Sequence, residues 1–486
     1  MAQETKGESG LRKYWIAVPL VLILVLTFLI VQSSYSNNIS LQKPQVNQRT
    51  AQQDSQERSG VTEPTSNSGL TSGAVQTAKT MPADAASAKS PPVGTTSNNA
   101  AASVPAASDS TPAGGADITP AVSSQPADST ANDSLGNPEF IISEKAYDLL
   151  GQMTLEEKVH QLLFVTPEAL TGVSRVVQAG PTTQRSLDAH PVGGIIYFKS
   201  NIQNKEQIAA MIKNSQAFSK TPLFIGVDEE GGRVARLSGR FFPAIESMKK
   251  IGESGDPGKA YDIGVRIAAN ISALGFNVAF APVADVLTNP QNTAIGDRSF
   301  GSDPTLVADM VAQEVLGLQQ NGVSAAVKHF PGHGDTIADT HNGYAESTRT
   351  PEQLRSVEFL PFTAGIDADV DFVMLSHVSV INADDSKLPA SLSRKVVTEY
   401  LKHELGFAKI IITDSMSMGA VLNNYSPGEA AVLSLNAGTD MLLCPSSIDM
   451  TVKGILDAIQ TSLLTEKRID ESVAKILQIK INRGIL

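Results

Sequence analysis

A short apolar run in the middle of the chain ends in residues that could do acid–base chemistry. The segment Val323–Gly334 reads VSAAVKHFPGHG, so Lys328, His329 and His333 follow directly on strand-like residues. The run predicts a buried strand with polar side chains at its C-terminal end, and the glycines around Pro331 predict a loop after it. The segment therefore combines fixed polar groups with a loop that could carry a mobile acid/base.

That loop contains an Asp-x-His triplet, Asp339–Thr340–His341. An imidazole titrates near neutrality, so His341 can donate and accept a proton without a large change of its pKa. The nearby carboxylate of Asp339 can select the ring tautomer and stabilise the imidazolium formed during turnover. A lone loop histidine would usually be bonded to backbone, but this pairing favours an acid/base dyad.

A second catalytic candidate, Asp414, ends the strand-like run in IIITDSMSMGA. A carboxylate held among hydrogen-bond donors can attack an anomeric carbon and form a glycosyl ester. A partner group must then protonate the leaving oxygen, and in retaining glycosidases the two groups lie about 5–5.5 Å apart. We therefore expect Asp414 to be the nucleophile and His341 to be the acid/base of a glycosidase.

A metal site is an alternative use of the same loop. Its possible zinc ligands are His329, His333, Asp335, Asp339 and His341. However, Pro331 and Gly332 break any helix that would place His329 and His333 on one face. We expect no metal ion and no other cofactor.

Charged or histidine side chains close five of the apolar runs. They are Asp228, Asp285, Lys328 with His329, His377 and Asp414. Capping of the next helix could explain any one of them but explains the whole set poorly. We expect Asp228, Asp285, Lys328, His329 and His377 to form the substrate site around Asp414.

Two segments carry further binding candidates. In VDEEGGRVARL, the paired glycines Gly231 and Gly232 would let a ligand approach the backbone beside Asp228. In FAPVADVLTNPQNTAIGDRSFG, Arg298 could reach the same pocket. For four neighbouring residues a structural ion pair is at least as good an explanation, namely Glu229, Glu230, Arg233 and Asp297.

From residue 138 onward, strand-like and helix-like patterns alternate, which predicts how these residues are positioned. The eight expected strands are Gln161–Val165, Val192–Phe198, Pro222–Asp228, Phe276–Val286, Val323–Lys328, Phe372–His377, Lys409–Asp414 and Ala437–Cys444. Helical patterns cover Lys205–Ser219, Pro257–Leu274, Thr305–Gln319, Pro351–Ile366, Arg394–Leu405 and Met450–Leu464. This order predicts an α/β fold, a (β/α)₈ TIM barrel with its chemistry at the C-terminal strand ends. An open doubly wound sheet is the alternative.

The first 137 residues have a different character. Tyr14–Val31 carries no charge and follows Arg12 and Lys13, so it predicts a membrane anchor after a short cytoplasmic tail, residues 1–13. No clear cleavage site follows, which favours an anchor over a removed signal peptide. Residues 32–137 are rich in Ser, Thr, Ala and Pro and predict a disordered linker with a reach of roughly 50–60 Å. The catalytic domain, residues 138–486, would then lie outside the cell.

Composition excludes some classes of function. The net charge of −12 argues against a nucleic-acid binder, which would present a basic face. The single cysteine, Cys444, excludes an internal disulfide bond.

Together these segments resemble glycoside hydrolase family 3, in particular its β-N-acetylhexosaminidase branch. The motifs VDEEGGRV, FAPVADV, IGDRSFG, KHFPGHGDT and IITDSMSMGA occur in the order of that family across residues 140–486. The resemblance implies a TIM barrel that removes terminal β-linked N-acetylglucosamine with retention. It implies Asp414 as nucleophile and the Asp339–His341 pair as acid/base. It also implies that Asp228, Arg298, Lys328, His329 and Asp285 contact the sugar.

Bacterial members of this branch usually act on muropeptides, fragments of peptidoglycan, which would suit a membrane-tethered extracellular enzyme. Thr340 stands where the family motif more often has serine, a change that should leave the dyad intact. Many relatives carry a second α/β domain that supplies a glutamate acid. We expect none here, since the Asp-x-His loop favours the N-acetylglucosamine branch. The alternatives are a β-glucosidase or β-xylosidase, a phosphorylase of the same fold, an inactive wall-binding protein and a zinc hydrolase.

Overall fold

The structure is a computed structural model that describes residues 140–337 and 345–486. The predicted tail, anchor and linker lie outside these residues, as do Asp339 and His341 of the predicted dyad. Within the two described ranges, no helix is both long and apolar enough to cross a bilayer. The anchor at Tyr14–Val31 therefore stays a prediction.

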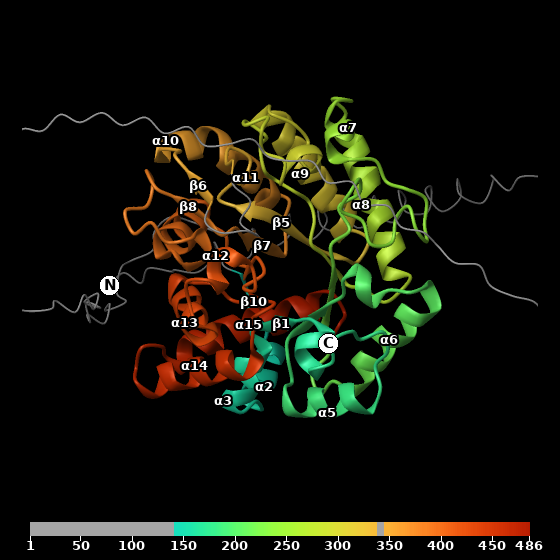
Figure 1. Cartoon of the computed structure of the whole chain (residues 1–486), viewed down its shortest axis with the longest axis vertical. Coiled ribbons are helices and arrows are strands. Elements are labelled where there is room, and N and C mark those ends of the chain that lie inside the picture. The colour runs from blue at the N-terminus through green and yellow to red at the C-terminus, as the bar shows by residue number, and fades with distance from the viewer. Residues whose placement is uncertain (1–139, 338–344) are drawn as a thin grey trace, which may run out of the picture. The chain divides into compact units, whose positions relative to one another are not determined.

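Eight parallel strands form the central sheet, which Figure 1 shows with helices packed around it. In chain order they are β1 (Leu163–Val165), β2 (Gly194–Ile196), β3 (Phe224–Val227), β4 (Val278–Ala279), β5 (Ser324–Phe330), β7 (Phe372–Leu375), β9 (Ile410–Thr413) and β10 (Leu442–Leu443). Each pairs with the next, and β10 pairs with β1. A parallel bridge between Ile412 and Met441 joins β9 to β10 and closes the ring. The predicted TIM barrel is confirmed, and the open doubly wound sheet is wrong.

Helices connect the strands and cover the outside of the barrel. The longer ones are α2 (Glu144–Gly151), α5 (Pro181–Ala189), α6 (Lys205–Phe218), α8 (Pro257–Ser272), α9 (Pro304–Gln319), α11 (Phe359–Asp367), α13 (Pro427–Ala437), α14 (Ile448–Gln460) and α15 (Glu466–Asn482). Shorter helices are α3 (Leu155–Gln161), α4 (Pro167–Thr171), α7 (Met248–Gly252), α10 (Pro351–Gln353) and α12 (Gly419–Leu422). Single 3₁₀ turns are η1 (Lys199–Asn201), η2 (Gly296–Arg298) and η4 (Ala390–Leu392), while η3 (Leu354–Glu358) and η5 (Lys395–Glu404) are π-helical. A small second sheet pairs β6 (Ala345–Ser347) with β8 (Val378–Val380).

Aromatic rings fill the interior of the barrel. Phe164 of β1 packs edge-on against Phe280, which follows β4, with ring centroids 5.3 Å apart. This packing requires a residue without a side chain between them, because a Cβ at Gly226 of β3 would lie 2.6 Å from Phe280 and 2.8 Å from Phe164. Phe224 and Phe372 form a second edge-on pair at 5.2 Å. The barrel is thus a packed core that supports the strand ends above it.

Candidate active site

The predicted site residues lie at or just after the C-terminal ends of five strands. Asp228 follows β3, Asp285 follows β4, and His377 and Asp414 follow β7 and β9, whereas Lys328 and His329 are among the last three residues of β5. Parallel strands present their carboxyl ends at the same mouth of a barrel. The side chains of Asp228 and Arg298 are 18% and 15% exposed, so these two groups remain accessible at that mouth.

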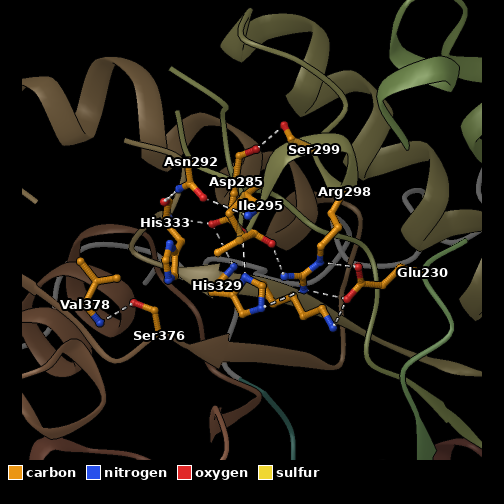
Figure 2. A network of polar contacts seen from close by, with 12 residues as sticks. Glu230, Asp285, Asn292, Ile295, Arg298, Ser299, His329, His333, Ser376 and Val378 are labelled. Atoms are coloured by element: carbon orange, nitrogen blue, oxygen red, sulfur yellow. Dashed lines mark hydrogen bonds and ion pairs between the residues drawn. The ribbon is translucent and has the colours of Figure 1, made fainter. Parts of the chain in front are cut away.

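An ion-pair network links the loops after β3 and β4 to β5. Glu230 receives two hydrogen bonds from Arg298, at 2.8 and 2.9 Å, and lies 2.6 Å from the Nζ of Lys328. Lys328 also donates to Asp228 at 3.2 Å, and Arg236 donates to the other oxygen of Asp228 at 3.2 Å. Burial alone would raise the pKa of Glu230, but Lys328 and Arg298 hold it well below its usual range. The network fixes Asp228 and Arg298 in place (Figure 2 shows the Glu230–Arg298 contacts).

Asp285 orients His329, which follows Lys328 in β5 and contacts Arg298 of this network. It is fully buried, and its Oδ2 accepts a 2.7 Å hydrogen bond from His329 Nδ1. Its Oδ1 accepts the backbone N–H groups of His329 and His333, at 3.2 and 2.7 Å (Figure 2). With Nδ1 as the donor, His329 Nε2 accepts from Arg298 at 3.4 Å. Asp285 therefore positions His329, and its contact with the sugar stays a prediction.

His377 is likewise a supporting residue. Its side chain is fully buried, with Nδ1 2.7 Å from Ser391 Oγ and Nε2 donating to the carbonyl oxygen of Ser415 at 3.0 Å. Both ring nitrogens therefore face protein atoms. In the structure His377 holds the turn that carries Asp414, and its contact with the substrate stays a prediction.

Asp414 is the carboxylate at the end of β9. Its backbone N–H donates to Leu375 of β7 at 2.8 Å, and its Oδ1 accepts the N–H of Ser415 at 2.7 Å. Burial would raise its pKa, but the neighbouring side chains of His329, His377 and Lys328 and the Ser415 hydrogen bond together lower the pKa below the usual value. Asp414 is therefore ionised at neutral pH, as a nucleophile must be.

Other charged residues near the site are structural. Glu229 accepts three backbone N–H groups, from Arg236, Leu237 and Ser238 at 2.7–2.9 Å, and so shapes the loop after β3. Arg233 pairs with Asp297 at 2.8 Å. The ion-pair explanation holds for this pair and for Glu230, but Glu230 also positions both Arg298 and Lys328. Sequence reasoning did not find this role, and the only signal was its place two residues after Asp228.

Within the described residues, no group of three or more His, Cys, Asp or Glu side chains is arranged to hold a metal ion. His329 and His333 lie with their ring centroids 6.1 Å apart and face different partners. Two of the five proposed zinc ligands, Asp339 and His341, fall outside the described residues.

The family is decided by residues 154–479, which match the description "Glycosyl hydrolase family 3 N terminal domain". The chain belongs to glycosyl hydrolase family 3. The matched region contains the whole barrel and every described residue of the candidate site. The family inferred from the motifs is therefore confirmed.

Relatives in family 3 point to one branch of it. Beta-hexosaminidase A of Pseudoalteromonas piscicida is 32% identical over 329 residues, and the match covers 62% of this chain and 55% of that protein. A beta-hexosaminidase of Nitrosomonas eutropha is 34% identical over 310 residues, which cover 61% of this chain and 88% of that protein. The predicted branch and enzyme class agree with these relatives.

A solved structure supports the same branch. A glycoside hydrolase family 3 beta-N-acetylglucosaminidase from Paenibacillus sp. str. FPU-7 aligns with a TM-score of 0.65 and 35% identity. The alignment covers 68% of this chain and 63% of that chain. This chain thus matches little more than half of the length of some of its relatives.

Proposed function

We propose that the protein is a retaining glycosidase that hydrolyses terminal, non-reducing β-linked N-acetylglucosamine. The observation that carries this proposal is the position of the Asp414 carboxylate after β9, at the barrel mouth that also carries the Asp228–Lys328–Glu230–Arg298 network. A nucleophile next to fixed donors and acceptors for hydroxyl groups suits a sugar substrate. The names of the relatives support N-acetylglucosamine as that sugar.

In the proposed reaction, a carboxylate oxygen of Asp414 attacks the anomeric carbon and the bond to the leaving oxygen breaks. A glycosyl ester forms on Asp414, and water then attacks the same carbon to release the sugar with retained configuration. Positive charge develops at the anomeric carbon in the transition state, which the nearby carboxylate stabilises. Asp228, Arg298, Lys328 and His329 would contact hydroxyl groups of the sugar, as the family resemblance implies.

The proton donor in this proposal is His341, assisted by Asp339. The imidazolium would protonate the leaving oxygen in the first step, and the neutral imidazole would deprotonate water in the second. Both residues lie outside the described residues, so the assignment rests on their sequence and on the resemblance described above.

The proposed natural substrates are peptidoglycan fragments, and the proposed location is the outer face of the cell membrane. The apolar segment Tyr14–Val31 would anchor the enzyme, and residues 32–137 would let it reach into a cell wall. Cell fractionation tests the location. The enzyme should stay with the membranes and lose its catalytic domain to external protease, whereas a soluble product in the medium would indicate cleavage.

Two variants test the catalytic roles. Asp414→Ala should abolish turnover of aryl β-N-acetylglucosaminides, because no glycosyl ester can form. His341→Ala should slow substrates with poor leaving groups by about 10²–10⁴-fold, and activated aryl substrates much less, since these need little protonation. The measurement is kcat/KM over a series of leaving groups, with trapping of a fluorosugar adduct on Asp414.

Several outcomes would contradict the proposal. Equal losses on good and poor leaving groups would exclude His341 as the acid, and no turnover at all would favour a binding protein. Preference for substrates without the acetamido group would favour a β-glucosidase. Release of a sugar phosphate in phosphate buffer would favour a phosphorylase, and loss of activity with a chelator would favour a zinc enzyme. A comparison of N-acetylglucosaminyl-muramic acid with chitobiose tests the proposed source of the substrate.

A further inference from the structure

A second arginine holds the turn that carries Arg298. Arg233, in the loop after β3, donates from Nη2 to three successive carbonyl oxygens in the loop after β4. These oxygens belong to Thr293, Ala294 and Ile295, at 2.8, 2.8 and 3.0 Å. They lie immediately before η2, the 3₁₀ turn that ends in Arg298. One guanidinium thus ties this turn to the neighbouring loop.

Ala294 links the two arginines directly. Its carbonyl oxygen accepts from Arg233 Nη2 at 2.8 Å and from Arg298 Nη1 at 3.2 Å. Arg298 also donates twice to Glu230, at 2.8 and 2.9 Å (Figure 2). Arg233 therefore supports the backbone that leads to Arg298, while Glu230 orients the side chain of Arg298.

Asn292 holds the same turn from the interior. Its side chain is buried, and its Oδ1 accepts the N–H of Ile295 at 2.9 Å. Its Nδ2 donates to the backbone oxygen of His333 at 2.7 Å (Figure 2). The turn thus has a buried support in Asn292 and an exposed support in Arg233. Without Arg233 it would keep the first and lose the second.

The paired glycines of the sequence explain how Arg233 reaches this turn. Gly231 and Gly232 have φ angles of +92° and +53°, in the left-handed region that favours glycine. The N–H of Val234 donates to the carbonyl oxygen of Gly231 at 3.1 Å, so Arg233 lies in a tight turn. A Cβ at Gly232 would lie 2.9 Å from the Cα of Ser247. The close approach that the glycines allow is thus made by the chain itself, and it fixes the path of the loop that presents Arg233.

We propose that Arg233 is a positioning residue for substrate binding, because its contacts to the carbonyl oxygens before η2 hold Arg298 where it can contact the sugar. This inference rests on the proposed function and adds a residue to it. Arg233 Nε also pairs with Asp297 at 2.8 Å, but these two side chains are 47% and 44% exposed. An exposed ion pair contributes little to stability. Loss of Arg233 should therefore loosen the turn without unfolding the barrel.

The test is a double-mutant cycle between Arg233 and Arg298 in the full chain, measured as kcat and KM for an aryl β-N-acetylglucosaminide. Arg233→Met alone should raise KM on the order of 10-fold and change kcat little, because a displaced Arg298 weakens ground-state and transition-state binding alike. In an Arg298→Lys background, which lacks the bidentate pair with Glu230, the same substitution should change KM less than about twofold. Binding of free N-acetylglucosamine, followed by NMR titration, should weaken in parallel and needs no turnover.

Further variants separate the carbonyl contacts from the ion pair. Asp297→Asn keeps an oxygen for Arg233 Nε and leaves the carbonyl contacts in place, so its KM should stay within about twofold of wild type. Arg233→Lys keeps the charge but lacks the planar fork, and its KM should lie between those of wild type and Arg233→Met. It also serves if Arg233→Met does not fold. The matched control is Arg185→Met, because Arg185 is an exposed arginine on α5 that donates to Thr182 of the same helix; it should keep the wild-type KM.

Two results would overturn the positioning role. One is an equal rise in KM from Arg233→Met in both backgrounds, and the other is an Asp297→Asn variant as impaired as Arg233→Met. Either result would leave the glycosidase proposal intact. Absence of turnover in the wild type would instead refute the proposed function itself.

Discussion

Two buried glutamates near the site are held in opposite protonation states by their neighbours. Glu230 contacts Lys328 and Arg298 and stays ionised despite its burial. Glu314, on α9, is also fully buried, but neither carboxyl oxygen has a hydrogen-bond partner among the described residues. Burial raises the pKa of Glu314 to about 8, and the charge of Glu230 adds to the shift while Lys328 opposes it. Glu314 is therefore mostly protonated at neutral pH.

Replacing Glu314 should change how stability depends on pH. The unfolded side chain loses its proton near the ordinary pKa of 4.5, whereas the folded one keeps it to about 8. Across that window the folded state binds more protons, so this residue makes stability fall as pH rises. Glu314→Gln lacks this pH dependence. Its free energy of unfolding minus that of the wild type should therefore rise by up to about 1.4 kcal/mol for each unit by which the pH is raised.

Urea unfolding between about pH 5 and 8 measures this difference. Glu471→Gln is the control, because Glu471 is an exposed glutamate on α15. Its relative stability should stay nearly constant over the same range. Parallel pH profiles for Glu314→Gln and the wild type would show that Glu314 is ionised throughout.

The composition of the site was largely predictable, but the partners within it were not. The strand-like runs that end in Asp228, Lys328, His329 and Asp414 predicted that these residues lie together, because the parallel strands of a barrel all end at the same mouth. The pairing of Glu230 with Arg298 spans 68 residues of sequence, and no local pattern encodes it. For the same reason, the sequence could not show which of the polar side chains are fully buried, as those of Asp285 and His377 are.

At the scale of elements, the periodicity of the sequence located all eight barrel strands and six helical regions. The helix predicted at Thr305–Gln319 is confirmed as α9, and Asp303 caps it by accepting the N–H of Thr305 at 2.9 Å. Other features depend on tertiary contacts. β6 and β8 are only three residues long and are stabilised by pairing with each other, and the regular helical patterns of η3 and η5 gave no sign of their π-helical geometry.

The close packing between α8 and α9 could not be predicted from the sequence either. Gly317 of α9 approaches α8 so closely that a Cβ there would lie 2.3 Å from the carbonyl oxygen of Tyr261. Gly264 of α8 is equally restricted, with 2.5 Å to the carbonyl oxygen of Glu314. A glycine inside a helical pattern normally lowers the expectation of a helix. Here it lets two helix backbones meet, and this contact brings Glu314 into the core.

At the scale of the whole barrel, the last helix joins the first secondary elements of the described chain. α15 packs against α2 and α3, and Gln478 accepts the N–H of Ser143 at 2.7 Å. From the same helix, the fully buried Lys480 donates to Gln161 at 3.0 Å and lies 5.1 Å from the ring of Phe224. Phe224 begins β3, so Lys480 lies at the N-terminal end of the barrel, opposite the candidate site.

Lys480 should therefore affect stability and leave the site unchanged. Burial lowers its pKa from the ordinary 10.5 to about 7. Between these two pH values the unfolded chain keeps the proton on Lys480, whereas the folded chain has lost it. This makes stability rise with pH from about 7 to 10.5. Lys480→Met lacks this contribution. Its free energy of unfolding minus that of the wild type should therefore fall by up to about 1.4 kcal/mol per pH unit as pH rises through the window.

Thermal or urea unfolding at several pH values, with kcat/KM as a second readout, checks this prediction. Lys453→Met is the control, since Lys453 is exposed on α14 and pairs only with Asp457 in the next turn. A large fall in kcat/KM for folded Lys480→Met would contradict a purely structural role. A pH-independent stability difference would show that Lys480 keeps its charge.

The ring of strands has a consequence for synthesis of the protein. β10 lies between β9 and β1, so the gap in the ring is filled by Leu442 and Leu443, near the end of the barrel sequence. While the ribosome is still translating the preceding residues, β1 and β9 both expose unpaired backbone edges, which are templates for pairing with other chains. The ring can therefore close only after β10 has been synthesised, and the hydrogen-bonding edges of β1 and β9 that face it have no partner strand until then.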